Sequence, residues 1–144
     1  MGERHIGKMM RILSNLVRRK IENELNQRGM EVTSSQARII SYVYRQTQIQ
    51  NVYQRDIEAE FDIRRSTATN TLQLLEKNGY ILRVSVDEDA RLKKILLTDK
   101  GIRIHEAVTK SILEVEGAIN NVYTKEELDE LFYLLDKLYV FLEE

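Results

Sequence analysis

The chain of 144 residues contains no cysteine and no proline. Without cysteine it has no disulfide, no thiolate zinc finger and no thiol-based redox sensor. Average proline usage of about 5% would give roughly seven prolines in a chain of this length. Because proline interrupts the hydrogen-bond ladder of a helix, its absence suits long continuous helices.

Long apolar runs are also missing. No stretch of 18 apolar residues occurs, which argues against membrane spans. The first residues, MGERHIGKMM, carry charge but lack the apolar segment of a secretory signal. Hydrophobic residues make up 42% of the chain, which is enough for a packed core in one domain, residues 1–144. We therefore expect a single-domain cytoplasmic protein.

The formal net charge is only −1, but charge is unevenly distributed along the chain. Residues 1–30 have a balance of +4 and residues 64–94 a balance of +3, whereas residues 95–144 have −6. This asymmetry is typical of a nucleic-acid-binding part joined to a separate partner-binding part. Ordinary solvated surface charge is the alternative that these numbers leave open.

Two helices are expected at the start of the chain. Apolar residues at helical spacing predict one over residues 6–27, ended by Gly29. Thr33 and Gln36 form a capping box that opens the next. We expect its inward residues to be Ala37, Ile40, Val43 and Tyr44. Residues 47–53 should be irregular, with a short strand near Val52.

Residues 54–101 hold two short helical patterns followed by a hairpin and a further helix. The first helix covers residues 54–61, and Asp62-Ile63 is the turn. The second starts at Arg65 or Ser66 and ends before Gly79, with Ala68, Leu72 and Leu75 on its buried stripe. Strand-like residues 80–86 and 92–97 flank a loop, residues 87–91. This order predicts a helix-turn-helix with a wing, whose second helix suits the major groove of DNA.

Two helices are expected at the end of the chain. Thr98 is the expected cap of the first, and its inward residues should be Ile104, Val108, Ile112, Val115 and Ile119. Thr124 and Glu127 form a capping box for the second. That helix repeats leucine at alternating steps of three and four, at Leu128, Leu131, Leu135, Leu138 and Leu142. This coiled-coil-like seam favours a homodimer, and docking onto the chain's own core is the alternative.

The helix after the turn carries a polar row opposite its buried stripe. Ser66, Thr69, Asn70 and Gln73 follow the spacing i, i+3, i+4 and i+7. Short hydroxyl and amide groups can read base edges, and Asn or Gln can pair bidentately with adenine. Arg64 and Arg65 stand at the N-terminal end, where the helix favours a phosphate. Taken alone, the row is better explained as helix caps and solvated side chains, and it is the helix before it and the wing after it that favour DNA contact.

The hairpin tip carries a second candidate contact. Asp89 and Arg91 are two residues apart, so a turn can let the carboxylate orient the guanidinium for the narrow minor groove. Lys93 and Lys94 could then contact flanking phosphates. A solvated acidic turn is the alternative. A calcium loop does not fit, because Thr98 stands where the twelfth-position Glu is needed.

Several short motifs occur in a fixed order along the chain. They are Asp56-Ile57-x-Ala59, Ile63, Ser66-Thr67, Leu75-Glu76-Lys77-x-Gly79, Arg83, Asp89-x-Arg91 and Leu97-Thr98-x-x-Gly101. Each is weak alone, but their order and spacing are specific. With them the chain, over about residues 5–142, resembles the multiple-antibiotic-resistance regulator (MarR) family of bacterial and archaeal transcription factors.

The resemblance implies a fold and a function. The fold is mainly α (α+β), with a winged helix-turn-helix over residues 30–98 and dimerisation helices over residues 1–29 and 99–144. The function is that of a homodimeric repressor on pseudo-palindromic double-stranded DNA. Helix 65–78, with Thr67, would enter the major groove, and Arg91, braced by Asp89, the minor groove. Small ligands, often phenolic or otherwise anionic, would bind between the two parts and weaken DNA binding.

Two features depart from the family pattern. Arg64 occupies a position often held by a small capping residue, which would move the cap to Ser66. The wing tip, residues 87–89, is acidic, which predicts modest and salt-sensitive affinity.

Three other functions compete with DNA-dependent regulation. An enzyme is disfavoured, because no catalytic motif is present and the only histidines are His5 and His105. A metal-responsive regulator could use His105 with Glu106, but two distant histidines support it weakly. A winged helix used only for protein contact is opposed by the polar row and the arginine-tipped wing. No cofactor is expected.

Overall fold

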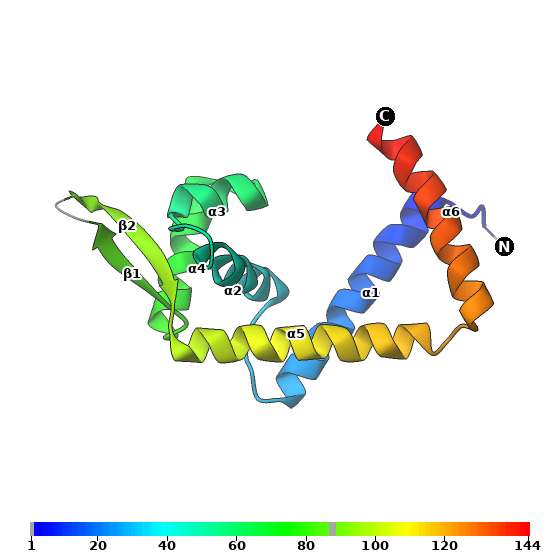
Figure 1. Cartoon of the computed structure of the whole chain (residues 1–144), viewed down its shortest axis with the longest axis horizontal. Coiled ribbons are helices and arrows are strands. Elements are labelled where there is room, and N and C mark those ends of the chain that lie inside the picture. Colours follow the sequence, from blue (N-terminus) through cyan, green and yellow to red (C-terminus); the bar gives the residue numbers. More distant parts are fainter. Residues whose placement is uncertain (1, 87–88) are drawn as a thin grey trace.

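The computed structural model of this chain describes residues 2–86 and 89–144. Its elements are α1 (Ile6–Gln27), α2 (Ser34–Thr47), α3 (Gln54–Phe61), α4 (Arg65–Lys77), β1 (Ile81–Val86), β2 (Asp89–Leu97), α5 (Asp99–Asn120) and α6 (Lys125–Glu143). Helices α2 to α4 and the hairpin gather at one end of the long α5, and α6 lies at its other end (Figure 1). The predicted winged helix-turn-helix with flanking helices is confirmed.

The hydrophobic core lies within the winged unit. Fully buried aliphatic side chains from α2, α3, α4 and the two strands meet there, namely Ile40, Val43, Ile57, Leu72, Leu75, Ile81 and Ile95. Burying one such side chain contributes about 1.5–3 kcal/mol. Ala68 is also fully buried, so the predicted inward stripe of α4 is confirmed. This core fixes the orientation of α4 on α3.

Local signals set the helix ends at Thr33, Gly79, Thr98 and Thr124 as predicted. In both capping boxes the threonine hydroxyl accepts a backbone N–H bond, from Gln36 and from Glu127. The Thr98 hydroxyl accepts from the Gly101 N–H and caps α5. Gly79 follows α4 with φ of +80°, a conformation that side chains disfavour. These residues end and begin helices by satisfying backbone groups at their termini.

Three boundaries differ from the prediction. β2 begins at Asp89 instead of residue 92, so the expected loop over residues 87–91 is too long. A register shift between Ser85 and Val86 accommodates the extra residues. The strand expected near Val52 is an isolated bridge between Tyr53 and Lys94. Helix α4 starts at Arg65, so the cap does not move to Ser66.

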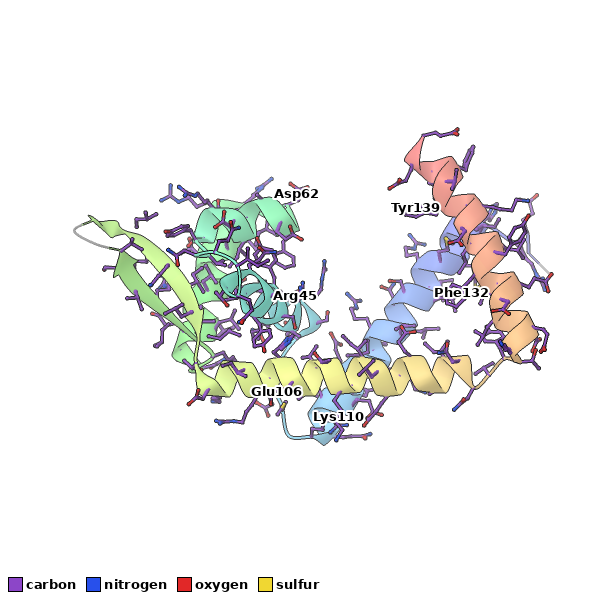
Figure 2. All side chains as sticks on the ribbon, viewed as in Figure 1. Arg45, Asp62, Glu106, Lys110, Phe132 and Tyr139 are labelled. Atoms are coloured by element: carbon purple, nitrogen blue, oxygen red, sulfur yellow. The ribbon has the colours of Figure 1, made fainter. Side chains whose placement is uncertain are left out.

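Helix α6 has no buried residue. The alternative prediction for this helix, that it packs on the chain's own core, is therefore wrong. Phe132 and Tyr139 are 57% and 62% exposed, on a helix remote from the winged unit (Figure 2). Ile112 on α5, expected inward, is 39% exposed. Met9, Leu13 and Leu16 on α1 are exposed as well, so both chain ends carry apolar surface.

No helix in the described part of the chain is both long and apolar enough to span a bilayer.

His105 lies where α5 packs on α2. Its ring stacks on Tyr44 with centroids 4.1 Å apart, and its Nδ1 lies 3.0 Å from the hydroxyl of Ser41. Burial lowers the pKa of His105, the charge of Arg45 lowers it further, and Glu106 opposes the shift. The neutral imidazole is therefore favoured in the folded protein.

We expect His105 to make the protein less stable in mild acid. Because its folded-state pKa is below the unfolded value, the unfolded chain binds more protons, and stability present above about pH 6.5 is lost as pH falls through the folded pKa. Urea midpoints measured between pH 7.5 and 5.5 should fall more for the wild type than for His105→Gln. Equal slopes for the two proteins would contradict the assignment.

Candidate nucleic-acid interface

The outward face of α4 carries most of the predicted polar row. Ser66, Asn70 and Gln73 are exposed, and so is Thr67. Their side chains stand opposite the buried stripe of Ala68, Leu72 and Leu75. Three of the four residues in the predicted row are thus available to a partner molecule.

Thr69, the fourth residue of that row, is partly covered and contacts α3. The amide Nε2 of Gln54 donates to the Thr69 hydroxyl oxygen at 2.9 Å and to the backbone carbonyl of Arg65 at 3.4 Å. Gln54 is the first residue of α3. Sequence reasoning missed Gln54, because the contact joins residues 15 positions apart in different helices.

The N-terminal end of α4 is strongly positive. Arg64 is the N-cap residue and makes no side-chain capping bond, so free backbone N–H groups remain there. Arg64 and Arg65 are exposed, and neither pairs with any carboxylate that the structure describes. Two guanidinium groups beside a helix N-terminus favour an anion such as phosphate.

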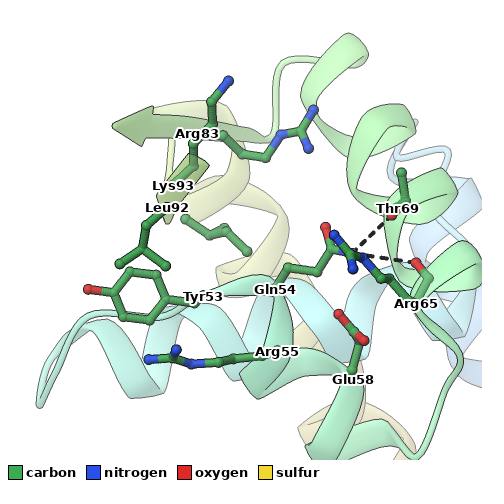
Figure 3. A pocket seen from close by; sticks show the side chains of 10 residues that line it. Tyr53, Gln54, Arg55, Glu58, Arg65, Thr69, Arg83, Leu92 and Lys93 are labelled. Atoms are coloured by element: carbon green, nitrogen blue, oxygen red, sulfur yellow. Dashed lines mark hydrogen bonds between the residues drawn. The ribbon is translucent and has the colours of Figure 1, made fainter. Parts of the chain in front are cut away.

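A groove of about 480 Å³ separates α4 from the wing (Figure 3). It is lined by Tyr53, Gln54, Arg55, Glu58, Arg65, Thr69, Arg83, Leu92, Lys93 and Ile95. Four of these residues are cationic and only Glu58 is acidic. Arg55 also lies over the Tyr53 ring, 5.0 Å from its centroid. We call this feature the basic groove. It adds Tyr53, Gln54 and Arg55 to the candidate DNA-binding residues that the sequence indicated.

The start of α3 is attached to the wing. The Ile95 N–H donates to the Val52 carbonyl at 2.7 Å, and the Asp56 carboxylate accepts from the Tyr53 N–H at 2.8 Å. The first bond joins the segment just before α3 to β2, and the second caps the first turn of α3. Together with the bonds from the Gln54 amide to α4, they connect α3 to both other walls of the basic groove.

Arg83 ties the wing to α4. Its Nε donates to Glu76 Oε2 at 2.9 Å, and this bond lowers the pKa of Glu76. Lys93 lines the basic groove, whereas Lys94 pairs with Val84 across the hairpin. Because side chains alternate along a strand, the two lysines lie on opposite faces of the wing. The predicted contacts of both lysines with flanking phosphates stay predictions.

The predicted bracing of Arg91 by Asp89 lies outside the described side chains. The backbone of both residues belongs to β2. The ion pair and the minor-groove contact therefore stay predictions.

Within the described residues, no three His, Asp or Glu side chains come together as a metal site would require. His105, the candidate ligand, instead contacts Ser41 and Tyr44.

The sequence comparisons place the winged unit among transcription regulators. A model of the MarR family matches residues 29–92. The HTH-type transcriptional regulator BilQ of Clostridioides difficile is 31% identical over 70 residues, which are 49% of this chain and 40% of BilQ. The curated relatives that match are thus aligned over less than half of their own length, 40% and 46%.

The structural comparisons cover nearly the whole chain. MepR, a transcription regulator of the Staphylococcus aureus multidrug efflux pump MepA, is 27% identical with a TM-score of 0.84, over 96% of this chain and 99% of MepR. MepR in complex with DNA has a TM-score of 0.76 at 28% identity, with 97% and 99% covered. A Clostridium acetobutylicum protein assigned to the MarR family is 30% identical, with a TM-score of 0.71 and 92% and 95% covered.

Proposed function

Because the chain belongs to the MarR family, we propose that it is a homodimeric, sequence-specific DNA-binding regulator of transcription that acts as a repressor. The observation that carries this proposal is the exposed polar face of α4 beside the basic groove. Groups that read base edges and cations that bind phosphates are thereby combined on one surface. The relatives are named transcriptional regulators, which favours a regulator over an enzyme.

We assign residues 30–98 to DNA binding and residues 1–29 and 99–144 to dimerisation. The first assignment is supported by the buried core that joins α2, α3, α4 and the hairpin. The second is supported by the exposed apolar side chains of α1 and α6. An apolar face of this extent is unusual for a monomer in water.

In this proposal α4 enters the major groove of DNA. Ser66, Asn70 and Gln73 face base edges, while Arg64 and Arg65 contact phosphate. The basic groove lies over the adjacent backbone strand, where Lys93 neutralises a further phosphate. Arg91, braced by Asp89, enters the minor groove. Two such heads in a dimer require an inverted repeat.

The proposal is tested by selecting binding sites from a random double-stranded DNA library with the purified full chain. We expect an inverted repeat with half-sites about 10–10.5 base pairs apart, one turn of the helix. Binding to the selected site should exceed binding to a scrambled duplex in a fluorescence-anisotropy titration. Equal affinity for both at low ionic strength would refute sequence-specific DNA binding and favour a protein-contact module.

Arg91→Ala should weaken binding to the selected site by about 1–3 kcal/mol, because a guanidinium in the minor groove is a desolvated charge contact. Asp89→Ala should weaken binding too, although it removes a negative charge. Lys110→Ala, which removes one charge from α5 away from the wing, is the control (Figure 2). Tighter binding of Asp89→Ala would show that this carboxylate only repels DNA.

We also propose that a small-molecule effector, phenolic or otherwise anionic, releases the DNA. Family resemblance alone supports this step. A shallow cavity of about 360 Å³ lies between α1 and α2, but Glu22 and Glu31 line it and disfavour an anion. Thermal-shift screening of phenolic acids, followed by the DNA titration, would detect a releasing ligand. Failure of all of them would leave a constitutive DNA binder.

A further inference from the structure

We infer that Gln54 orients the hydroxyl of Thr69 so that its proton is presented to a hydrogen-bond acceptor atom of DNA. This inference rests on the proposed DNA-binding function and names a positioning residue for it. Gln54 lies on α3 and Thr69 on α4, and both line the basic groove (Figure 3).

The orientation of the Gln54 amide follows from its two partners. One partner is the backbone carbonyl oxygen of Arg65, which can only accept a hydrogen bond. The side-chain atom that faces this carbonyl must therefore be the NH₂ group and not the amide oxygen. Because the same nitrogen lies 2.9 Å from Thr69 Oγ1, the Thr69 oxygen is the acceptor in that contact as well.

The proton of the Thr69 hydroxyl is consequently left for another partner. Among the contacts that the structure describes, Thr69 Oγ1 donates to no protein group. Glu58 lines the same groove but makes no hydrogen bond to Thr69 there. Threonine hydroxyls in helices often donate to the carbonyl four residues earlier, as Thr47 does to Val43, but among the described contacts Thr69 makes no such bond to Arg65.

The surroundings select the kind of partner. Arg55, Arg65 and Lys93 make the basic groove cationic, so an electron-rich acceptor is favoured and a donor is repelled. In DNA such acceptors are phosphate oxygens and the N7, O6 and O4 atoms of the major groove. The amino groups of cytosine and adenine are donors, and Gln54 already occupies one of the two acceptor positions of the Thr69 oxygen, which leaves the Thr69 proton for an acceptor.

The inference is tested with four full-length variants, each compared with the wild type on the DNA site that the wild type selects. Thr69→Val keeps the shape of the side chain and removes its donor, so we expect about tenfold weaker binding. Thr69→Ser retains the hydroxyl and should bind within about twofold of the wild type. Gln54→Met keeps the length of the side chain and should weaken binding several-fold. In the Thr69→Val background, Gln54→Met should have no further effect, because both act through one hydroxyl.

Modified DNA identifies the acceptor. Methylphosphonate substitution removes the charge of one phosphate, 7-deazapurines remove one N7 acceptor, and base analogues without O6 or O4 remove those acceptors. At the position that Thr69 contacts, one of these modifications should abolish the difference between wild type and Thr69→Val. Gln48→Met, in which the lost amide bond is to its own helix at Tyr44, is the matched control and should bind like the wild type.

The outcomes separate the inference from the proposed function. No sequence-specific binding by the wild type would refute both. Specific wild-type binding with unchanged affinity of Thr69→Val would refute the inference alone. Independent, additive effects of Gln54→Met and Thr69→Val would also refute it, because Gln54 would then act only by holding α3 against α4. Circular-dichroism melting of each variant identifies any loss that comes from unfolding.

Discussion

Leu135→Glu combined with Leu142→Glu should convert the protein from a dimer to a monomer and abolish tight DNA binding. Both leucines lie in the α6 seam and are 38% and 68% exposed in the single chain. If the partner subunit buries what is still exposed of these leucines, the four per dimer contribute roughly 3–6 kcal/mol, and a carboxylate in their place adds a desolvation cost. Light scattering at micromolar concentration measures the change in mass.

DNA affinity should fall with the dimer. Two linked winged helix-turn-helix units, one from each subunit, bind an inverted repeat with an avidity advantage of about 10²–10⁴ over a single unit. Lys137→Glu is the matched control, because it changes the charge of α6 by the same −2 at an exposed polar position. A double variant that remains dimeric would place the interface elsewhere, for instance on the apolar residues of α1 alone.

Much of this fold could be predicted because its signals are local. The Thr33 and Thr124 boxes, the Thr98 cap and Gly79 act within a few residues of the helix ends that they define. The buried stripe of α4 follows from helical periodicity alone. Such features depend on neighbours in sequence, and the chain carries no proline that would interrupt them.

The basic groove could not be predicted, because its walls come from three separate segments. Gln54, Thr69 and Lys93 meet only after α3, α4 and β2 have packed together. Thr69 looked equivalent to Asn70 in the polar row, yet its hydroxyl is held by Gln54. The second strand of the wing was predicted too short for a related reason. The bulge near Ser85 depends on how the two strands pair, which no local pattern encodes.

The exposure of α6 shows a second feature that one chain by itself does not explain. Leucines at steps of three and four predicted burial, and the protomer leaves the helix without a buried residue. A sequence specifies which face must be covered, whereas the covering surface can belong to a second copy. We therefore predict that the leucine seam of α6 and the exposed apolar residues of α1 together form the dimer interface.

Gly101 occupies the first turn of α5, at the junction between the wing and the long helix. A Cβ atom added there would overlap the backbone carbonyl oxygen of Tyr80 and would lie 3.2 Å from Cδ2 of Leu97. The Tyr80 oxygen cannot move freely, because it accepts the Thr98 N–H at 3.1 Å. The close approach of two backbones thus explains why this position needs glycine.

Gly101→Ala should destabilise the protein by about 3 kcal/mol or more, because the clash is with backbone and cannot be relieved by a rotamer change. Gly117→Ala, in the same helix with open space around the added methyl group, should instead stabilise it by about 1 kcal/mol through helix propensity. Urea unfolding followed by circular dichroism compares the two variants. Since α5 joins the winged unit to α6, which we propose to form the dimer interface, Gly101→Ala should also weaken DNA binding at temperatures where it remains folded. Equal stability of both variants would show that α5 can shift away from Tyr80 without cost, and that the junction does not fix the position of the winged units.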